Sequence, residues 1–121
     1  MKTILVVEDE KHLRTLYSQE LIAEGYQVVT AQDGNEALET VKNSPIDLAI
    51  LDIKLQGENG LEVLRDVMER NRGLKVIINT AYSSYRNDFT SWSADAYIVK
   101  SSDLEELKSK VRELVPLVAG S

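Results

Sequence analysis

The sequence predicts an α/β fold, a doubly wound sheet of five parallel strands with helices on both faces. Short segments rich in Val, Ile and Leu alternate with segments whose apolar residues recur at helical spacing. Five such alternations are typical of right-handed strand–helix–strand crossovers, which build a parallel sheet. The 121 residues fit one domain, and we expect residues 1–121 to form it, with 117–121 as a tail or the start of a linker.

Five segments are expected to be strands because they are short and dominated by branched apolar residues. They are residues 3–7, 26–31, 46–51, 74–79 and 96–99. The third is almost continuously apolar, which is typical of a strand that is buried on both faces of a parallel sheet.

Helices are expected between the strands and after the last one. They lie at about 11–24, 33–44, 59–70, 82–92 and 102–115. Gly25 is expected to end the first in a left-handed conformation, and Leu13, Leu16, Tyr17 and Leu21 form its expected inner face. The second and fifth helices begin with sequences close to a capping box, at 33–36 and 102–105.

The fourth expected helix carries most of the aromatic residues of the chain on one stripe. These are Tyr82, Tyr85, Phe89 and Trp92. We favour core packing against the sheet as the role of this stripe, and a partner-binding face is the alternative.

Composition excludes several classes of function. The chain has no cysteine and one histidine, His12, which argues against disulfides, thiolate metal sites and an imidazole-rich metal site. A net charge of −6 argues against direct nucleic-acid binding. No apolar run is long enough for membrane insertion, and the N-terminal segment does not resemble a signal peptide, so we expect a cytoplasmic protein.

Acidic residues end two strands that the fold should bring together. The expected strand order is 2-1-3-4-5, the flavodoxin-like arrangement, in which strands 1 and 3 flank the point where ligands bind. Glu8 and Asp9 follow strand 1, and Asp52 follows strand 3. Three adjacent carboxylates repel one another unless a cation lies among them, and Mg²⁺ is the cation that best suits such oxygen ligands. Alternatively, Asp9 caps the first helix while Glu8 and Glu10 complement its dipole, which does not explain Asp52.

The next two strands end in a hydroxyl and an ammonium group. Thr80 follows the fourth strand and Lys100 the fifth. Each residue alone is most often structural or solvated, but together with the carboxylates they are the groups that phosphoryl transfer requires.

The chain resembles, over its whole length, the receiver domain of bacterial two-component response regulators. The matching motifs are Val6-Val7-Glu8-Asp9-Glu10, Leu51-Asp52-Ile53, Asn59-Gly60, Thr80-Ala81 and Ala94-Asp95-Ala96-Tyr97-Ile98-Val99-Lys100. The resemblance implies a signalling switch whose catalysis is limited to its own phosphorylation and dephosphorylation. It also implies a sensor histidine kinase or phosphotransfer protein as phosphodonor and a downstream target that the sequence does not identify.

The resemblance also assigns roles to residues. Asp52 would be the nucleophile that accepts the phosphoryl group. Asp9 and Asp52 would ligate Mg²⁺ with the backbone carbonyl of Lys54, and Glu8 would act through water. Lys100 would neutralise phosphoryl oxygens; the side chain of Lys54 is the weaker candidate for that role.

Signal output would be a shift between two states. Thr80 would bond to the phosphoryl group and Tyr97 would turn into the space that Thr80 leaves; the alternative for Tyr97 is a half-buried strand residue. The readout surface would be the face of residues 82–92, 96–99 and 102–115, through which two copies could also dimerise.

The sequence departs from the family pattern in loops. Ser101 stands where a proline, often cis, usually follows the lysine, and Gln56 and Ser93 replace a usual proline and glycine. Glu8 in place of a second aspartate is a familiar variant. None of these changes removes a reactive group. Two other functions remain as alternatives: a small Mg²⁺-dependent phosphohydrolase that uses Asp52, although Lys54 occupies the position of its usual second acid, and an interaction domain that does not depend on phosphorylation.

Overall fold

The computed structural model describes residues 2–52, 65–66, 68–70, 73–81, 94–101 and 103–117. Its elements, in chain order, are β1 (Thr3–Val7), α1 (Lys11–Glu24), β2 (Gln27–Ala31), α2 (Gly34–Asn43), β3 (Leu48–Leu51), β4 (Lys75–Thr80), β5 (Ala96–Val99) and α4 (Glu105–Leu114). The helices expected at 59–70 and 82–92, with the aromatic stripe, fall largely or wholly outside these residues.

The five strands form one parallel sheet in the order β2-β1-β3-β4-β5, which confirms the predicted fold. Three strands differ from the prediction in their boundaries. The strands expected at 26–31 and 46–51 begin later, at Gln27 and Leu48, and the strand expected at 74–79 is shifted by one residue to Lys75–Thr80. Tyr26 and Ile46 are buried but precede the paired residues, so their apolar character reflects burial rather than strand pairing.

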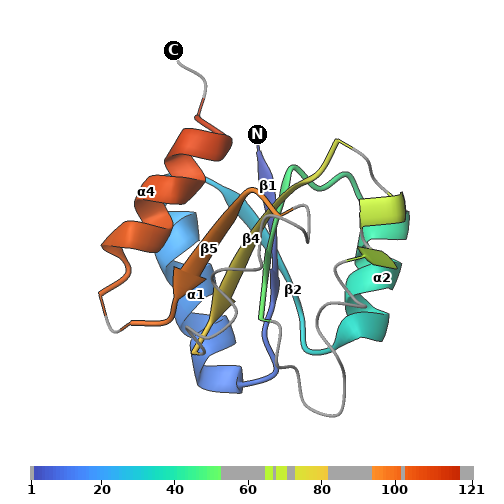
Figure 1. Cartoon of the computed structure of the whole chain (residues 1–121), viewed down its shortest axis with the longest axis horizontal. Coiled ribbons are helices and arrows are strands. Elements are labelled where there is room, and N and C mark those ends of the chain that lie inside the picture. The colour runs from blue at the N-terminus through green and yellow to red at the C-terminus, as the bar shows by residue number, and fades with distance from the viewer. Residues whose placement is uncertain are drawn as a thin grey trace.

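Helices cover both faces of the sheet. Figure 1 shows α1 and α4 on one side and α2 on the other. Side chains alternate along each strand, so that in β1 Ile4 and Val6 pack on the α1 and α4 side while Leu5 and Val7 pack on the α2 side. The sheet is therefore buried on both faces, as its apolar sequence predicts.

The first helix ends as predicted but turns a narrower face inward. Gly25 has a φ of 110°, and its N–H bonds to the carbonyls near the end of α1. Tyr17 and Leu21 are buried, whereas Leu16 is exposed, which corrects its expected place on the inner face. Leu16 directly precedes Tyr17, and about 100° of helical rotation turns it toward the surface.

The two expected capping boxes are met in part. Asp33 accepts a hydrogen bond from the N–H of Glu36, but the Glu36 carboxylate accepts from the N–H of Gln32 instead of closing the box on Asp33. The last helix begins at Glu105, whose N–H donates to Asp103; Ser102 lies outside the described residues.

Two aspartates secure the amino-terminal ends of strands. Asp47 accepts from the N–H of Thr3 at 2.8 Å and donates its own N–H to the Thr3 carbonyl. Asp95 does the same for Val76, with its carboxylate 2.7 Å from the amide nitrogen. Both carboxylates therefore satisfy amides that begin strands, at the edge opposite to the acids that follow β1 and β3.

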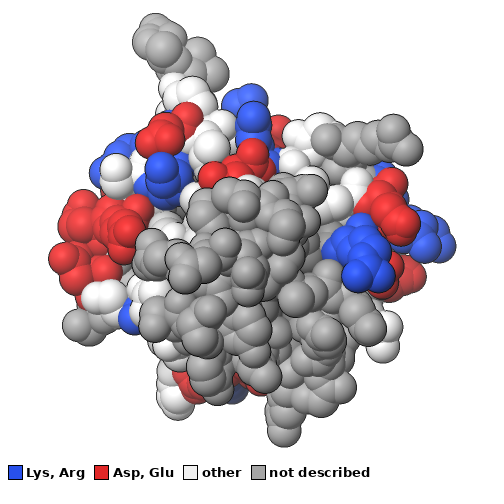
Figure 2. All heavy atoms as spheres, in the orientation of Figure 1, with Lys and Arg blue, Asp and Glu red and all other residues white. Residues whose placement is uncertain are grey.

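Acidic and basic side chains lie close together near two of the helices on one face of the molecule (Figure 2). Figure 2 shows them mixed over α4 and beside α2. Within the part of the chain that is described, no helix combines the length and apolar character needed to cross a membrane.

Candidate phosphoacceptor and metal site

The acidic residues meet because β1 and β3 are neighbours in register. Val7 pairs with Leu51, so Glu8 and Asp52 follow at the same edge of the sheet. The N–H of Glu8 bonds to Ala31 on β2, and the N–H of Asp52 bonds to Val7 on β1. The backbone that carries both acids is therefore fixed by the sheet.

Glu8, Asp9 and Asp52 form one carboxylate cluster. One oxygen of each lies within 4.8 Å of those of the other two. Glu8 and Asp52 are buried, and Asp9 is half-buried. Oxygens on opposite sides of an octahedral Mg²⁺ lie about 4.2 Å apart, since each bond is about 2.1 Å. The oxygen-only donor set and its compactness therefore fit Mg²⁺.

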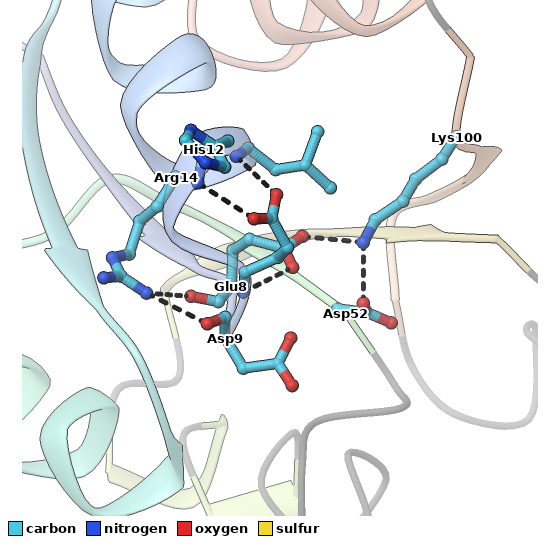
Figure 3. A network of polar contacts seen from close by, with 8 residues as sticks. Glu8, Asp9, His12, Arg14, Asp52 and Lys100 are labelled. Atoms are coloured by element: carbon cyan, nitrogen blue, oxygen red, sulfur yellow. Dashed lines mark hydrogen bonds and ion pairs between the residues drawn. The ribbon is translucent and has the colours of Figure 1, made fainter.

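Lys100 brings a positive charge to the cluster. Its Nζ lies 2.7 Å from Glu8 Oε1 and 2.8 Å from Asp52 Oδ2, so it bridges β1 and β3 from the end of β5 (Figure 3). Burial alone would lower the pKa of Lys100, but its bonds to Asp52 and Glu8 hold that pKa above its ordinary value. The group stays charged, and the predicted convergence of Lys100 with the acids is confirmed.

Both oxygens of Glu8 are bonded. Oε1 meets Lys100, and Oε2 accepts from the N–H of Glu10 at 3.1 Å. Burial nevertheless raises the pKa of Glu8 above its ordinary value, against the opposing effect of Lys100. Keeping the buried Glu8 carboxylate ionised therefore costs free energy, and additional positive charge nearby would reduce that cost.

The site includes two residues that the sequence did not single out in these roles. The Glu10 side chain caps α1 by accepting from the N–H groups of His12 and Leu13, and these bonds lower its pKa. Capping is the alternative considered for Asp9, whose carboxylate lies in the cluster with Glu8 and Asp52. On the other side of the loop, Arg14 Nη1 donates to the backbone carbonyls of Glu8 and Asp9. Neither role has a sequence motif, although Glu10 is a carboxylate at the start of a helical pattern.

Thr80 and Tyr97 lie on the same face of neighbouring strands. Thr80 pairs with Val99, and Tyr97 pairs with Ile78, two residues before Thr80. Tyr97 belongs to the core cluster on the α2 side and is 5% exposed, so the alternative of a half-buried strand residue is wrong. Thr80 is fully buried.

Some expected site residues lie outside the description. These are Lys54, Gln56, Asn59, Gly60 and Ser93. Ser101 is described, and since the described part of the chain contains no cis peptide bond, the bond between Lys100 and Ser101 is trans.

Comparisons with known sequences agree with this geometry. The family model of the response regulator receiver domain matches residues 4–112. The response regulator ArlR of Staphylococcus epidermidis is 36% identical over 116 residues, which cover 95% of this chain and 53% of that protein. The chain therefore spans about half the length of the curated relatives it matches.

Solved structures of response regulators and receiver domains are also similar to this chain. The response regulator TrrA of Thermotoga maritima, in complex with Mg²⁺ and BeF, has a TM-score of 0.88 and 48% identity, with 95% of this chain and 100% of that chain covered. TrrA in complex with the histidine kinase ThkA gives a TM-score of 0.86 at the same identity, with 95% and 99% covered. A CheY-like receiver domain from Methanospirillum hungatei has a TM-score of 0.87 and 35% identity, over 93% of this chain and 92% of that chain.

Proposed function

The chain belongs to the response regulator receiver domain family and is a module of phosphorylation-dependent two-component signalling, and on this premise we propose that Asp52 accepts the phosphoryl group. The observation that carries the proposal is the position of Asp52, at the end of β3, within the carboxylate cluster and 2.8 Å from Lys100. A carboxylate is an established covalent nucleophile toward phosphorus.

The transfer makes one bond and breaks one. A carboxylate oxygen of Asp52 forms a bond to phosphorus while the bond from phosphorus to the leaving group of the donor breaks, and the electron pair leaves with that group. No proton needs to be removed from the nucleophile, because Asp52 reacts as a carboxylate. Catalysis then depends on positioning and charge neutralisation.

The residues of the cluster supply both the positioning and the charge neutralisation. Lys100 neutralises phosphoryl oxygens, and Thr80, at the end of the strand beside β3, donates a hydrogen bond to the attached group. Asp9, Asp52 and the carbonyl of Lys54 would hold Mg²⁺, with Glu8 acting through water; the ion would neutralise charge on the phosphoryl oxygens. The co-bound Mg²⁺ and BeF in the structure of TrrA support this assignment.

Signal output would depend on Thr80 and Tyr97. Movement of Thr80 toward the phosphoryl group opens space on the α2 side of the sheet, where Tyr97 packs two residues away on the neighbouring strand. The resulting change would reach the expected readout surface of residues 82–92, 96–99 and 102–115. A downstream target, or a second copy of the chain, would read that surface.

The phosphodonor would be a sensor histidine kinase or a phosphotransfer protein in the cytoplasm. The complex of TrrA with a histidine kinase supports this class of partner. The domain would bind no nucleic acid directly and would catalyse only its own phosphorylation and dephosphorylation. Residues 1–121 form one receiver domain in this proposal, either free-standing or part of a longer regulator.

Intact-protein mass spectrometry with acetyl phosphate and Mg²⁺ tests the proposal. We expect one added phosphoryl group in the wild type and none in Asp52→Asn. Asp66→Asn, which changes an exposed aspartate outside the cluster, is the matched control and should be labelled like the wild type. No adduct at saturating donor would contradict the proposal and favour a phosphorylation-independent interaction domain. Release of many equivalents of phosphate per minute would favour a phosphohydrolase.

A further inference from the structure

The peptide group between Asp9 and Glu10 is held from both sides. Its carbonyl accepts from Arg14 Nη1 at 3.3 Å, and its N–H donates to Glu8 Oε2 at 3.1 Å. The same Arg14 nitrogen lies 2.8 Å from the carbonyl of Glu8. Two consecutive carbonyls therefore converge on one guanidinium nitrogen, which fixes the turn of the chain as it leaves β1.

That turn determines where the Asp9 carboxylate points. Figure 3 shows Arg14 on the side of the loop away from Lys100, with the carboxylate of Asp9 directed away from the guanidinium. The sheet fixes the chain as far as Glu8, through the bond from its N–H to Ala31. Asp9 is one residue further along, and the held peptide follows it directly.

Charge and geometry predict opposite effects for the removal of Arg14. Among the residues that the structure describes, the cluster combines three carboxylates with one ammonium group, a formal charge of −2. Arg14 adds a positive charge behind the loop, which by Coulomb repulsion alone weakens the binding of a cation. If Arg14 acts only through its charge, its loss strengthens metal binding; if it orients Asp9, its loss weakens metal binding.

We propose that Arg14 is a positioning residue that orients the carboxylate of Asp9 for Mg²⁺ by holding the carbonyls of Glu8 and Asp9. The inference rests on the proposed function, since it takes Asp9 as a metal ligand. Groups that orient metal ligands are typically worth about 10- to 100-fold in metal affinity. The lower end applies here, because Asp52 and its backbone are placed independently by β3.

Calorimetric titration with Mg²⁺ tests the proposal directly. Arg14→Met, which keeps the bulk but removes the donors and the charge, should bind Mg²⁺ about tenfold more weakly than the wild type. Arg14→Lys, which keeps the charge but not the planar donor group, should also bind more weakly. Arg112→Met, at the exposed ion pair of α4 with Glu24, is the matched control and should bind normally.

Two further readouts distinguish positioning from a general loss of structure. In metal-free protein, Arg14→Met should shift the amide resonance of Glu10 and speed its hydrogen exchange several-fold, at a temperature well below unfolding. With acetyl phosphate, the Mg²⁺ concentration for half-maximal phosphorylation should rise about tenfold, while the maximal rate stays within about twofold of the wild type.

Unchanged or tighter Mg²⁺ binding by Arg14→Met would overturn the inference, as would a lower maximal rate with unchanged Mg²⁺ dependence. A lower melting temperature with normal affinity would reduce Arg14 to a structural residue. Failure of the proposed function has a different signature, because the wild type itself would then bind no Mg²⁺ or accept no phosphoryl group.

Discussion

Replacement of Lys100 by methionine should destabilise the metal-free protein while it strengthens Mg²⁺ binding. At an effective dielectric constant of about 20, the pairs of Lys100 with Glu8 and Asp52 are each worth about 6 kcal/mol before desolvation. Each repulsion between two carboxylates at the outer separation in the cluster is worth about 3 kcal/mol. Among the described residues, these two attractions and three repulsions nearly balance, so the Lys100 ammonium group offsets most of the repulsion between the carboxylates.

The measurable loss is smaller than these pair energies. Breaking a buried ion pair typically costs about 3–5 kcal/mol. We expect about 3 kcal/mol here, because the side chain of Lys100 is 16% exposed and Glu8 can take up a proton. For 121 residues, an unfolding entropy of about 2.1 cal/mol/K per residue converts this loss into a melting temperature about 12 °C lower.

Urea unfolding at pH 7, with and without Mg²⁺, measures both effects. Removal of the ammonium group should tighten Mg²⁺ binding about tenfold, which at equal saturating Mg²⁺ returns about 1.4 kcal/mol of stability. Labelling by acetyl phosphate should slow about 100-fold, because a cation facing the phosphoryl group is lost. Lys110→Met, at an exposed pair with Glu113, is the control and should cost less than about 1 kcal/mol. If Lys100→Met were as stable as this control, or bound Mg²⁺ more weakly than the wild type, the electrostatic reasoning would be refuted.

Three other predictions concern Glu8, Asp95 and Tyr97. Burial raises the pKa of Glu8 above its unfolded value, so the folded protein keeps the proton to a higher pH than the unfolded chain does. The free energy of unfolding of the metal-free form should therefore fall as pH rises through the folded pKa. Glu8→Gln should flatten this dependence in urea titrations from pH 4 to 8. Asp95→Ala leaves the fully buried amide of Val76 without its carboxylate partner and should lower the free energy of unfolding by about 1–3 kcal/mol, and an unchanged unfolding midpoint would contradict this role. Tyr97→Ala should cost about 3 kcal/mol in thermal unfolding, because Tyr97 packs within the core, whereas a loss below about 1 kcal/mol would place the ring at the surface.

The sequence predicts the fold because each element has its own local signal. Short runs of branched apolar residues indicate the strands, apolar residues at helical spacing indicate the helices, and Gly25 indicates the end of α1, where it adopts the left-handed conformation. The sequence predicts the ends of strands less well, since Tyr26 and Ile46 are apolar and buried without being paired. Apolar character records burial, and pairing depends on neighbours far along the chain.

The site likewise has features that the sequence predicts and features that it does not. The convergence of Asp52 and Lys100 follows from strand order, since both residues end strands of one parallel sheet. The role of Arg14 does not follow, because it depends on where two backbone carbonyls point after β1. Which carboxylate caps α1 likewise depends on loop geometry, since either Asp9 or Glu10 could cap the helix on sequence grounds.

The acids at the two edges of the sheet should respond to different reagents. Asp47 and Asp95 each accept a hydrogen bond from a peptide N–H, whereas Glu8 and Asp52 contact the Lys100 ammonium group and form, with Asp9, the cluster that we propose holds a divalent ion. A chelator should therefore affect only the edge that carries Glu8, Asp9 and Asp52. Replacing Asp47 or Asp95 should lower the free energy of unfolding without changing the affinity for the metal ion. The edge that carries Lys100 is therefore expected to combine reactivity with stability, whereas Asp47 and Asp95 at the opposite edge are expected to contribute to stability alone.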